Sequence, residues 1–208
     1  AGVDSYNTAV GANAGVLVTT GVRNTIIGGL SGDALTDADD NVVLGYLALS
    51  NDTLGSRTIA IGKGALTTQN FTSATETYNT AMGYNAGNQV TTGVQNTLIG
   101  GLAGDALTGG GFSGTTRQDG ADFNTAVGYD ALHTDTLGSR SVAIGRRSLY
   151  TQNFTSATDS YNTAVGFNSG YAVTTGVQNT FVGGLAGDGT DDGASNTAVG
   201  YSALSANA

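Results

Sequence analysis

Hydrophobic residues along this chain occur in runs of three or four, bounded by a polar residue, usually Asn, on one side and Gly on the other, as in Asn-Thr-Ala-Val-Gly. Runs this short do not make a helical pattern and are typical of short β-strands. The run recurs along the whole chain, and its central glycines are Gly11, Gly28, Gly45, Gly62, Gly83, Gly100, Gly128, Gly145, Gly166, Gly183 and Gly200. Because a fixed period indicates a solenoid, we expect an all-β, parallel β-solenoid of about eleven coils of 17 residues, forming one domain over residues 1–208.

The intervals between these glycines also repeat at a higher level. Most are 17 residues, two are 21 and one is 28. Three coils of 17 and one of 21 make a block that is then duplicated, and the second block is longer through an insertion. We place this inserted loop at residues 105–123.

Each short strand is expected to present two apolar faces, because alternate side chains point to opposite sides. The residue directly before the glycine is always aliphatic or Met, and we expect it to line the solenoid interior. The middle residue of the strand would then face outward as an apolar stripe, which soluble monomers rarely expose. We therefore expect a homotrimer, with the interface formed by Ala9, Ile26, Val43, Leu98, Ala126 and Phe181; the alternative is a flattened coil whose other wall covers them.

The glycine and the Asn of the motif indicate how each coil turns. Glycine adopts backbone angles that side chains disfavour, and an Asn amide can hydrogen-bond the backbone of a corner. We expect obligatory glycine corners and an asparagine ladder from coil to coil.

Composition excludes several classes of protein. Of the 208 residues, 39% are hydrophobic and 11% charged, and the chain has no Cys, one His and a formal net charge of −9. This excludes a disulfide framework and a zinc–thiolate site and disfavours nucleic acid as a partner. No apolar run approaches the ~20 residues of a membrane-spanning helix, so direct membrane insertion is not expected.

Two segments resemble known repeats. The sequences SRTIAIGKGAL and SRSVAIGRRSL resemble the SVAIG-type repeats in the heads of YadA-like trimeric adhesins, and TGVQNTFVGGLAG resembles repeats of phage tail-fibre proteins. The resemblance implies a left-handed parallel β-roll, three chains about one axis, and a role in attachment at the cell exterior or virion surface. The coils of adhesin heads are shorter than 17 residues, so strand and turn lengths do not transfer.

Candidate chemistry is sparse, and no catalytic residue is assigned. The one histidine, His133, lies between coils and is read as a turn residue, so an enzyme is not expected. The aspartates Asp37, Asp39, Asp188 and Asp191 are weak candidates for a calcium site, and no cofactor is expected.

Irregular segments are better candidates for binding than repeats, because loops vary while scaffolds fill space. The receptor-binding candidates are Phe112 and Arg117 in the insertion, and Phe71 and Phe154 in the two QNFTSAT bulges. The expected partner is a cell-surface glycan or protein receptor.

The sequence thus favours a structural and adhesive segment of a surface or virion fibre. A calcium-binding or an ice-binding solenoid is the alternative, since threonines recur in register, although we expect them to share the core-facing side. A glycan-degrading tail-spike segment is less favoured for want of a pocket pattern.

Overall fold

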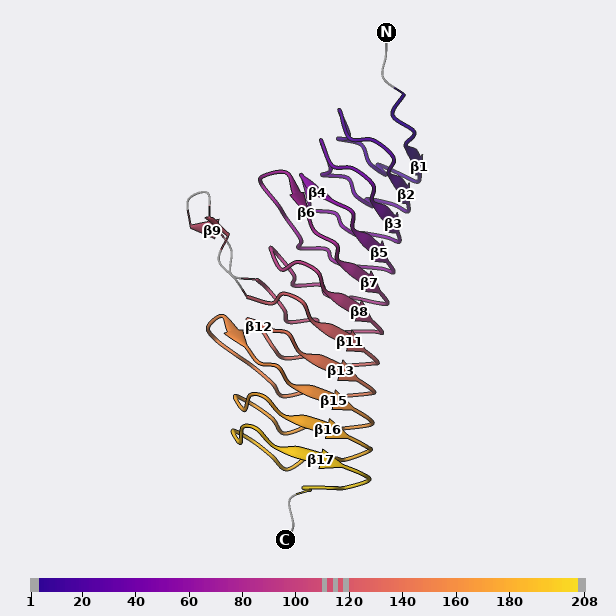
Figure 1. The fold of residues 1–208 in the computed structure, drawn as a ribbon. Helices are drawn as coiled ribbons and strands as arrows, with labels where there is room; N and C mark the ends of the chain where they lie inside the picture. The colour runs from indigo at the N-terminus through magenta and orange to yellow at the C-terminus, as the bar shows by residue number, and fades with distance from the viewer. Residues whose placement is uncertain (1–3, 110–111, 114–115, 118–119, 206–208) are drawn as a thin grey trace.

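The computed structural model describes residues 4–109, 112–113, 116–117 and 120–205. Within them the chain contains strands and turns but no helix, and hence none that could cross a membrane. Eleven three-residue strands form one parallel sheet that runs the length of the molecule (Figure 1). In sheet order the strands are β1 (Thr8–Val10), β2 (Thr25–Ile27), β3 (Val42–Leu44), β5 (Ile59–Ile61), β7 (Thr80–Met82), β8 (Thr97–Ile99), β11 (Thr125–Val127), β13 (Val142–Ile144), β15 (Thr163–Val165), β16 (Thr180–Val182) and β17 (Thr197–Val199).

Each strand pairs with the equivalent strand of the next coil, in register. Thr8 lies beside Thr25, and across the insertion Ala126 lies beside Leu98. Since paired strands are ~4.8 Å apart, eleven coils make a rod of roughly 50 Å. The predicted parallel β-solenoid of about eleven turns is confirmed.

The irregular coils carry additional short strands. Each 21-residue coil protrudes as a bulge, in which a two-residue strand pairs in parallel with one from the preceding coil: β4 (Gly55–Ser56) with β6 (Thr75–Glu76), and β12 (Gly138–Ser139) with β14 (Thr158–Asp159). The insertion contains an antiparallel pair, β9 (Phe112–Ser113) and β10 (Thr116–Arg117). Both types of addition lie on the side away from the long sheet (Figure 1).

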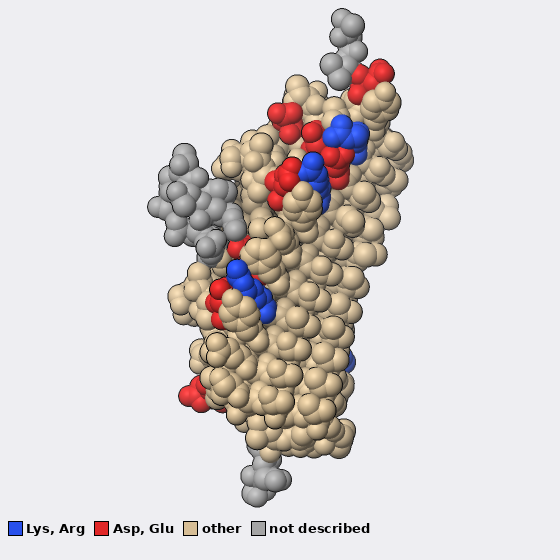
Figure 2. Space-filling model, viewed as in Figure 1, with Lys and Arg blue, Asp and Glu red and all other residues tan. Residues whose placement is uncertain are grey.

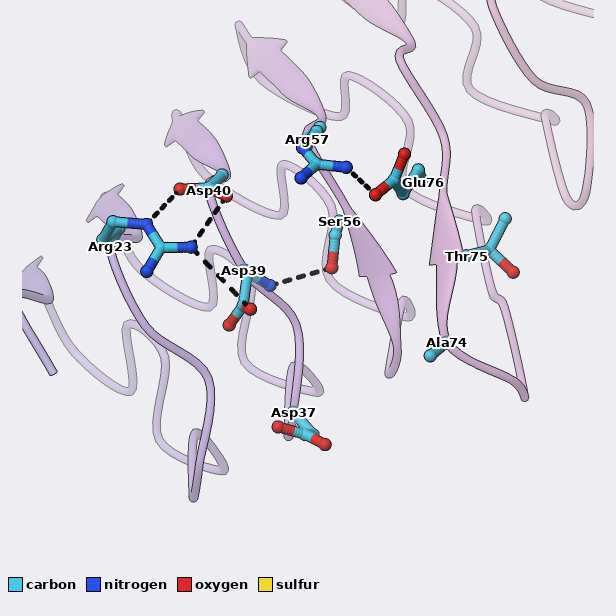
Figure 3. Close-up of a pocket in the computed structure, with 9 residues that line it drawn as sticks. All are labelled: Arg23, Asp37, Asp39, Asp40, Ser56, Arg57, Ala74, Thr75 and Glu76. Atoms are coloured by element: carbon cyan, nitrogen blue, oxygen red, sulfur yellow. Dashed lines mark hydrogen bonds and ion pairs between the residues drawn. The ribbon is translucent and has the colours of Figure 1, made fainter. Parts of the chain in front are cut away.

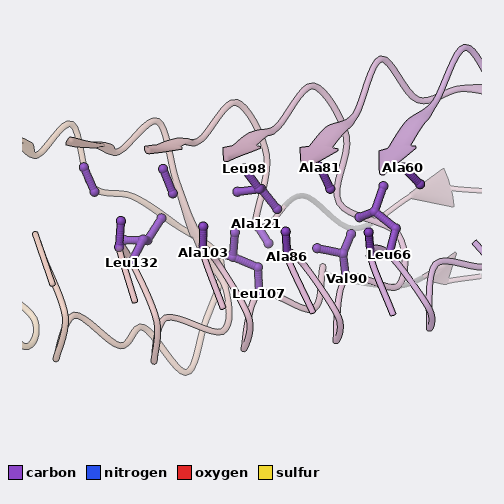
Figure 4. Packing of buried hydrophobic residues seen from close by; sticks show 14 of the residues in the cluster. Ala60, Leu66, Ala81, Ala86, Val90, Leu98, Ala103, Leu107, Ala121 and Leu132 are labelled. Atoms are coloured by element: carbon purple, nitrogen blue, oxygen red, sulfur yellow. The ribbon is translucent and has the colours of Figure 1, made fainter. Parts of the chain in front are cut away.

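The hydrophobic core lies between the middle residues of the strands and the opposite wall of each coil (Figure 4). Leu98 and Ala126 are fully buried, as are Leu107 and Leu132 from the other wall. The expected assignment of the two strand faces was therefore wrong: the residue before each glycine points outward, and the middle residue points inward. The physical reason is that the coil is flattened, so its second wall covers the middle residues within one chain.

Side-chain sizes within the core are complementary between the two walls. Phe181 packs so closely on Gly187 that a Cβ at the glycine would lie 2.4 Å from its ring, and a Cβ at Gly104 would lie 2.7 Å from Leu98. Where the strand offers Ala instead, the residue six positions later is often Leu, as in Ala126 and Leu132. Where both positions are small, as in Ala81 with Gly87 and Ala164 with Gly170, large side chains of the neighbouring coils approach the glycine, so the core stays filled.

Backbone geometry at the corners follows the expectation. All eleven motif glycines have φ between +122° and +145°. The expected asparagine ladder is present as well: the backbone N–H of Asn124 donates to Oδ1 of Asn96 at 2.9 Å, and Nδ2 of Asn96 donates to the carbonyl of Ala121 at 2.7 Å. These bonds satisfy polar groups that are buried along the rod.

The ladder is interrupted where Thr58 and Ser141 replace Asn, and at each interruption a buried glutamine, itself bonded to a buried aspartate, hydrogen-bonds to the next Asn of the ladder. Asp52 accepts hydrogen bonds from Nε2 of Gln69 (2.6 Å) and from the backbone N–H of Phe71 (3.0 Å). Gln69 in turn donates to Thr58 (3.2 Å). The same network recurs in the second block with Asp135, Gln152, Phe154 and Ser141.

Candidate functional site

The outward face of the long sheet is a candidate interaction surface that runs the length of the molecule. Its residues are the first and third of each strand, which are exposed or half-buried. None of them is charged: eight are Thr, and the others are aliphatic or Met. Figure 2 shows that in this view the charged side chains gather on the side of the bulged coils rather than over the strands.

The six residues expected to contact other chains lie elsewhere. Ile26, Val43, Leu98, Ala126 and Phe181 are at most 1% exposed and belong to the core of their own chain. Ala9 is exposed in β1, which is the edge strand of the sheet. The residues missed by the sequence analysis are their outward neighbours, such as Ile99 and Ile144, which are 36% and 37% exposed.

A second candidate site is an open polar cleft of about 360 Å³ where the first bulge rises from the shorter coils (Figure 3). Its outer wall comes from the two coils before the one that contains β4, and β4, β6 and the residues next to them form the rest. The lining residues are Arg23, Asp37, Asp39, Asp40, Ser56, Arg57, Ala74, Thr75 and Glu76.

Ion pairs organise the charges of this first cleft. The Arg23 guanidinium binds both carboxylate oxygens of Asp40, at 2.6 and 3.0 Å, and lies 3.9 Å from Asp39. The hydrogen bond from Arg23 lowers the pKa of Asp40. Arg57 pairs with Glu76, and its guanidinium lies over the Tyr78 ring at 5.7 Å.

A second cleft, of about 320 Å³, occupies the equivalent position at the second bulge. It is lined by Gly120, Ser139, Ala157, Thr158 and Asp159. Beside it, Arg140 pairs with Asp159 at 2.7 Å and lies between the Phe123 and Tyr161 rings, at 4.8 and 5.9 Å. Both clefts therefore combine an arginine–carboxylate pair with an adjacent aromatic ring.

The expected receptor contacts at the bulges were wrong. Phe71 is fully buried and Phe154 is 6% exposed, because each ring fills the interior of its bulge. In the insertion, the backbone of Phe112 pairs with that of Arg117. The side chains of these two residues lie outside the described part of the structure, so their role stays a prediction.

The aspartates considered for calcium are engaged by donors of the chain. Asp37 accepts a hydrogen bond from Thr20 (2.6 Å), Asp39 from the backbone N–H of Val22 (2.8 Å), Asp188 from Ser205 (2.5 Å), and Asp191 from Thr174. In the part of the chain that the structure describes, no three His, Cys, Asp or Glu side chains are placed to hold a metal ion.

The one histidine belongs to an aromatic stack. The His133 ring lies parallel to Tyr150 at 5.3 Å, and Tyr150 lies on Tyr171 at the same spacing. Arg147 covers Tyr150 and pairs with Asp130 at 3.2 Å. This stack joins successive coils, which is a structural role for His133.

Comparison with known proteins adds no family to these observations. No family model, no curated protein and no solved structure matches the chain. The resemblance to adhesin-head and tail-fibre repeats stays a prediction based on the motifs.

Proposed function

We propose that this chain is a structural and adhesive segment of a homotrimeric fibre, located at a cell exterior or on a virion. In this proposal the outward face of the long sheet is buried between copies, and the remaining surface is available for a receptor. The observation that carries it is the uncharged face formed by the first and third residues of all eleven strands.

The extent of this face supports burial. Eleven strands spaced ~4.8 Å apart, each about 10 Å long, cover on the order of 500 Å². The apolar part of this face is the row of third residues, all aliphatic or Met, beside which eight first residues are Thr. An exposed apolar row of this kind marks an interaction site. A surface that repeats along a rod also suits association of identical rods, because every coil then makes equivalent contacts.

The core and ladders support a mechanical role. Glycine corners and buried amides, with Gln69 and Gln152 at the two interruptions of the asparagine ladder, connect successive coils along the described part of the rod. Such a scaffold holds binding residues in fixed positions along its side.

The test is electron microscopy of the purified chain together with attachment of fluorescently labelled protein to candidate host cells. The proposal expects rods of one width about 50 Å long, and saturable attachment that excess unlabelled protein abolishes. Globular monomers without attachment to any surface would contradict it.

An ice-binding face is a second candidate function. It is favoured by the position of the recurring threonines, which the sequence analysis placed on the core-facing side. The threonines point outward rather than into the core, and Thr8 and Thr25, Thr80 and Thr97, and Thr180 and Thr197 pair in register. Thermal hysteresis distinguishes the candidates: a fibre segment gives none, whereas an ice-binding face gives hysteresis that Thr97→Lys abolishes.

A further inference from the structure

The two clefts beside the bulges are built by the same arrangement of the chain. In each, a 21-residue coil rises above the 17-residue coil directly before it, and the step is lined by a short parallel strand pair. Phe71 and Phe154 fill the bulges from inside, which fixes the position of the strands above them. The clefts are therefore features that the duplication of the block has produced twice.

The inner surfaces of the clefts match residue by residue, and their outer walls differ. Ser56, Ala74, Thr75 and Glu76 in the first cleft correspond to Ser139, Ala157, Thr158 and Asp159 in the second. The outer wall of the first contains Arg23 and three aspartates; among the residues that the structure describes, Gly120 lines the wall of the second. A shared inner surface with different walls is expected of two subsites for related parts of one ligand.

The groups in the clefts suit a ligand rich in hydroxyls. Volumes of about 360 and 320 Å³ fall at the lower end of the range for small-molecule sites, ~300–1,000 Å³. Carboxylates accept from several hydroxyl donors, and serine and threonine can both donate and accept. Exposed rings lie beside both clefts: Tyr78 is 50% exposed, Phe123 41% and Tyr161 52%. One face of each ring is covered by the guanidinium of Arg57 or Arg140, so the rings add exposed apolar surface beside the clefts without a stacking platform on that face.

Charge narrows the ligand class further. The first cleft contains two arginines and four carboxylates, which gives a net charge of −2. Both arginines are paired with carboxylates of the chain, and the whole chain carries −9. An anionic glycan would be repelled, because like charges in one site cost free energy.

We propose that the two clefts are subsites for an uncharged, hydroxyl-rich glycan, and that Ser56, Thr75 and Asp37, with Thr158 in the second cleft, supply hydrogen bonds to it. The proposal rests on the proposed attachment function and names its receptor class and its location. It places recognition on the bulges and not on the long sheet.

Duplication gives each chain two linked subsites. On the long sheet, the two bulged coils contribute β5 and β13. These strands are separated by four strand-to-strand spacings, or about 20 Å at the usual strand spacing. A glycan chain or a glycan-covered surface can engage both at once. Two linked weak sites bind such a surface far more strongly than either alone.

The experiment fills the clefts without touching the core. Ala74 and Ala157 are exposed and line the clefts, so Ala74→Trp with Ala157→Trp occupies both with a bulky ring. The matched control is Thr72→Trp with Thr155→Trp, which places the same rings on exposed bulge positions that line neither cleft. Binding of the full chain is measured on an array of neutral, sialylated and sulfated oligosaccharides, then by calorimetry with the best neutral oligosaccharide.

We expect the wild type and the control to bind neutral glycans, the cleft variant to bind at least tenfold more weakly, and each single filling to give an intermediate loss on the array. Binding of the cleft variant at wild-type strength, wild-type binding to anionic glycans only, or no binding to any glycan would each overturn the proposal. Sedimentation of the same samples separates this result from the proposed assembly. A trimer that binds no glycan contradicts only the clefts, and a monomer that binds neutral glycans contradicts only the trimer.

Discussion

A Cβ atom added at Gly128 would lie 2.6 Å from the carbonyl oxygen of Gly145 in the next coil. The same close approach recurs between successive motif glycines, because the backbones of neighbouring coils pack directly on each other at this corner. With φ at +138°, Gly128 also occupies a region that side chains rarely adopt. Glycine is thus required here both by conformation and by space.

We expect Gly128→Ala to lower the free energy of unfolding by at least about 1–3 kcal/mol, the usual cost of a strained backbone position, with the clash in addition. Urea denaturation followed by circular dichroism measures it. The control is Gly101→Ala, where the added Cβ would meet its nearest neighbour, in Tyr129, at 3.4 Å. Equal losses for the two variants would mean that the corner geometry does not matter.

Core complementarity gives a second prediction. Leu98→Ala should cost about 2–5 kcal/mol, the range for deleting a buried leucine side chain. Adding Gly104→Leu should recover more than half of the lost free energy of unfolding, because it recreates the Ala–Leu pair of Ala126 and Leu132. A leucine is compatible with this backbone, since φ is 52° at Leu132 and 58° at Gly104. A double-mutant cycle by chemical denaturation checks this, and additive losses would rule out the size exchange.

How far the sequence predicted the structure can be seen at Leu98. The period, the glycine corners and the asparagine ladder followed from the motif. The direction of the strand did not, because both of its faces are apolar and alternation alone cannot say which is inside. One signal was available: a large middle residue is followed six positions later by Gly, as in Leu98 with Gly104 and Phe181 with Gly187. This pairing of sizes indicates that the middle residue packs against the opposite wall of its own coil. The clefts depend on which coils protrude side by side, which no single motif encodes.

The buried carboxylates give a prediction for pH. Burial raises the pKa of Asp52 and of Asp135 above the ordinary value of 3.8, although hydrogen bonds from Phe71 and Gln152, among others, oppose the shift. A raised folded-state pKa means that the folded chain binds the proton more tightly. Protonation of the two aspartates therefore stabilises the folded chain. This contribution is complete below pH 3.8 and is lost as pH rises through the folded-state pKa.

Comparison of the wild type with the double variant Asp52→Asn/Asp135→Asn isolates this effect, because the other carboxylates contribute equally to the pH dependence of both proteins. We expect the stability of the wild type relative to the variant to fall as pH rises from about 4 to 7. Melting temperatures across this range measure it. A relative stability that increases with pH would contradict the assigned direction.

The insertion gives a prediction about folding. Replacing residues 105–123 by Asp-Ala-Leu-Thr-Asp-Ala-Asp-Asp should leave the melting temperature nearly unchanged. The shorter segment already closes the second coil, where Leu35 and Ala38 occupy the core positions of Leu107 and Ala121. Shortening a loop changes closure entropy by only a few tenths of a kcal/mol. If this exchange unfolds the chain, the insertion is structural; if it folds, reduced attachment to cells would place receptor contacts in the insertion, as the sequence analysis expects.

The central claim is that the outward strand face is buried between three copies of the chain, and sedimentation equilibrium at micromolar concentration tests it most directly. The account predicts three times 20.6 kDa for the wild type. It predicts one chain mass for Ile99→Asp/Ile144→Asp, with an unchanged circular dichroism spectrum, since these exposed side chains tolerate charge in a monomer but not in an interface. A well-folded wild-type monomer, or a trimer that the two charges leave intact, would contradict it.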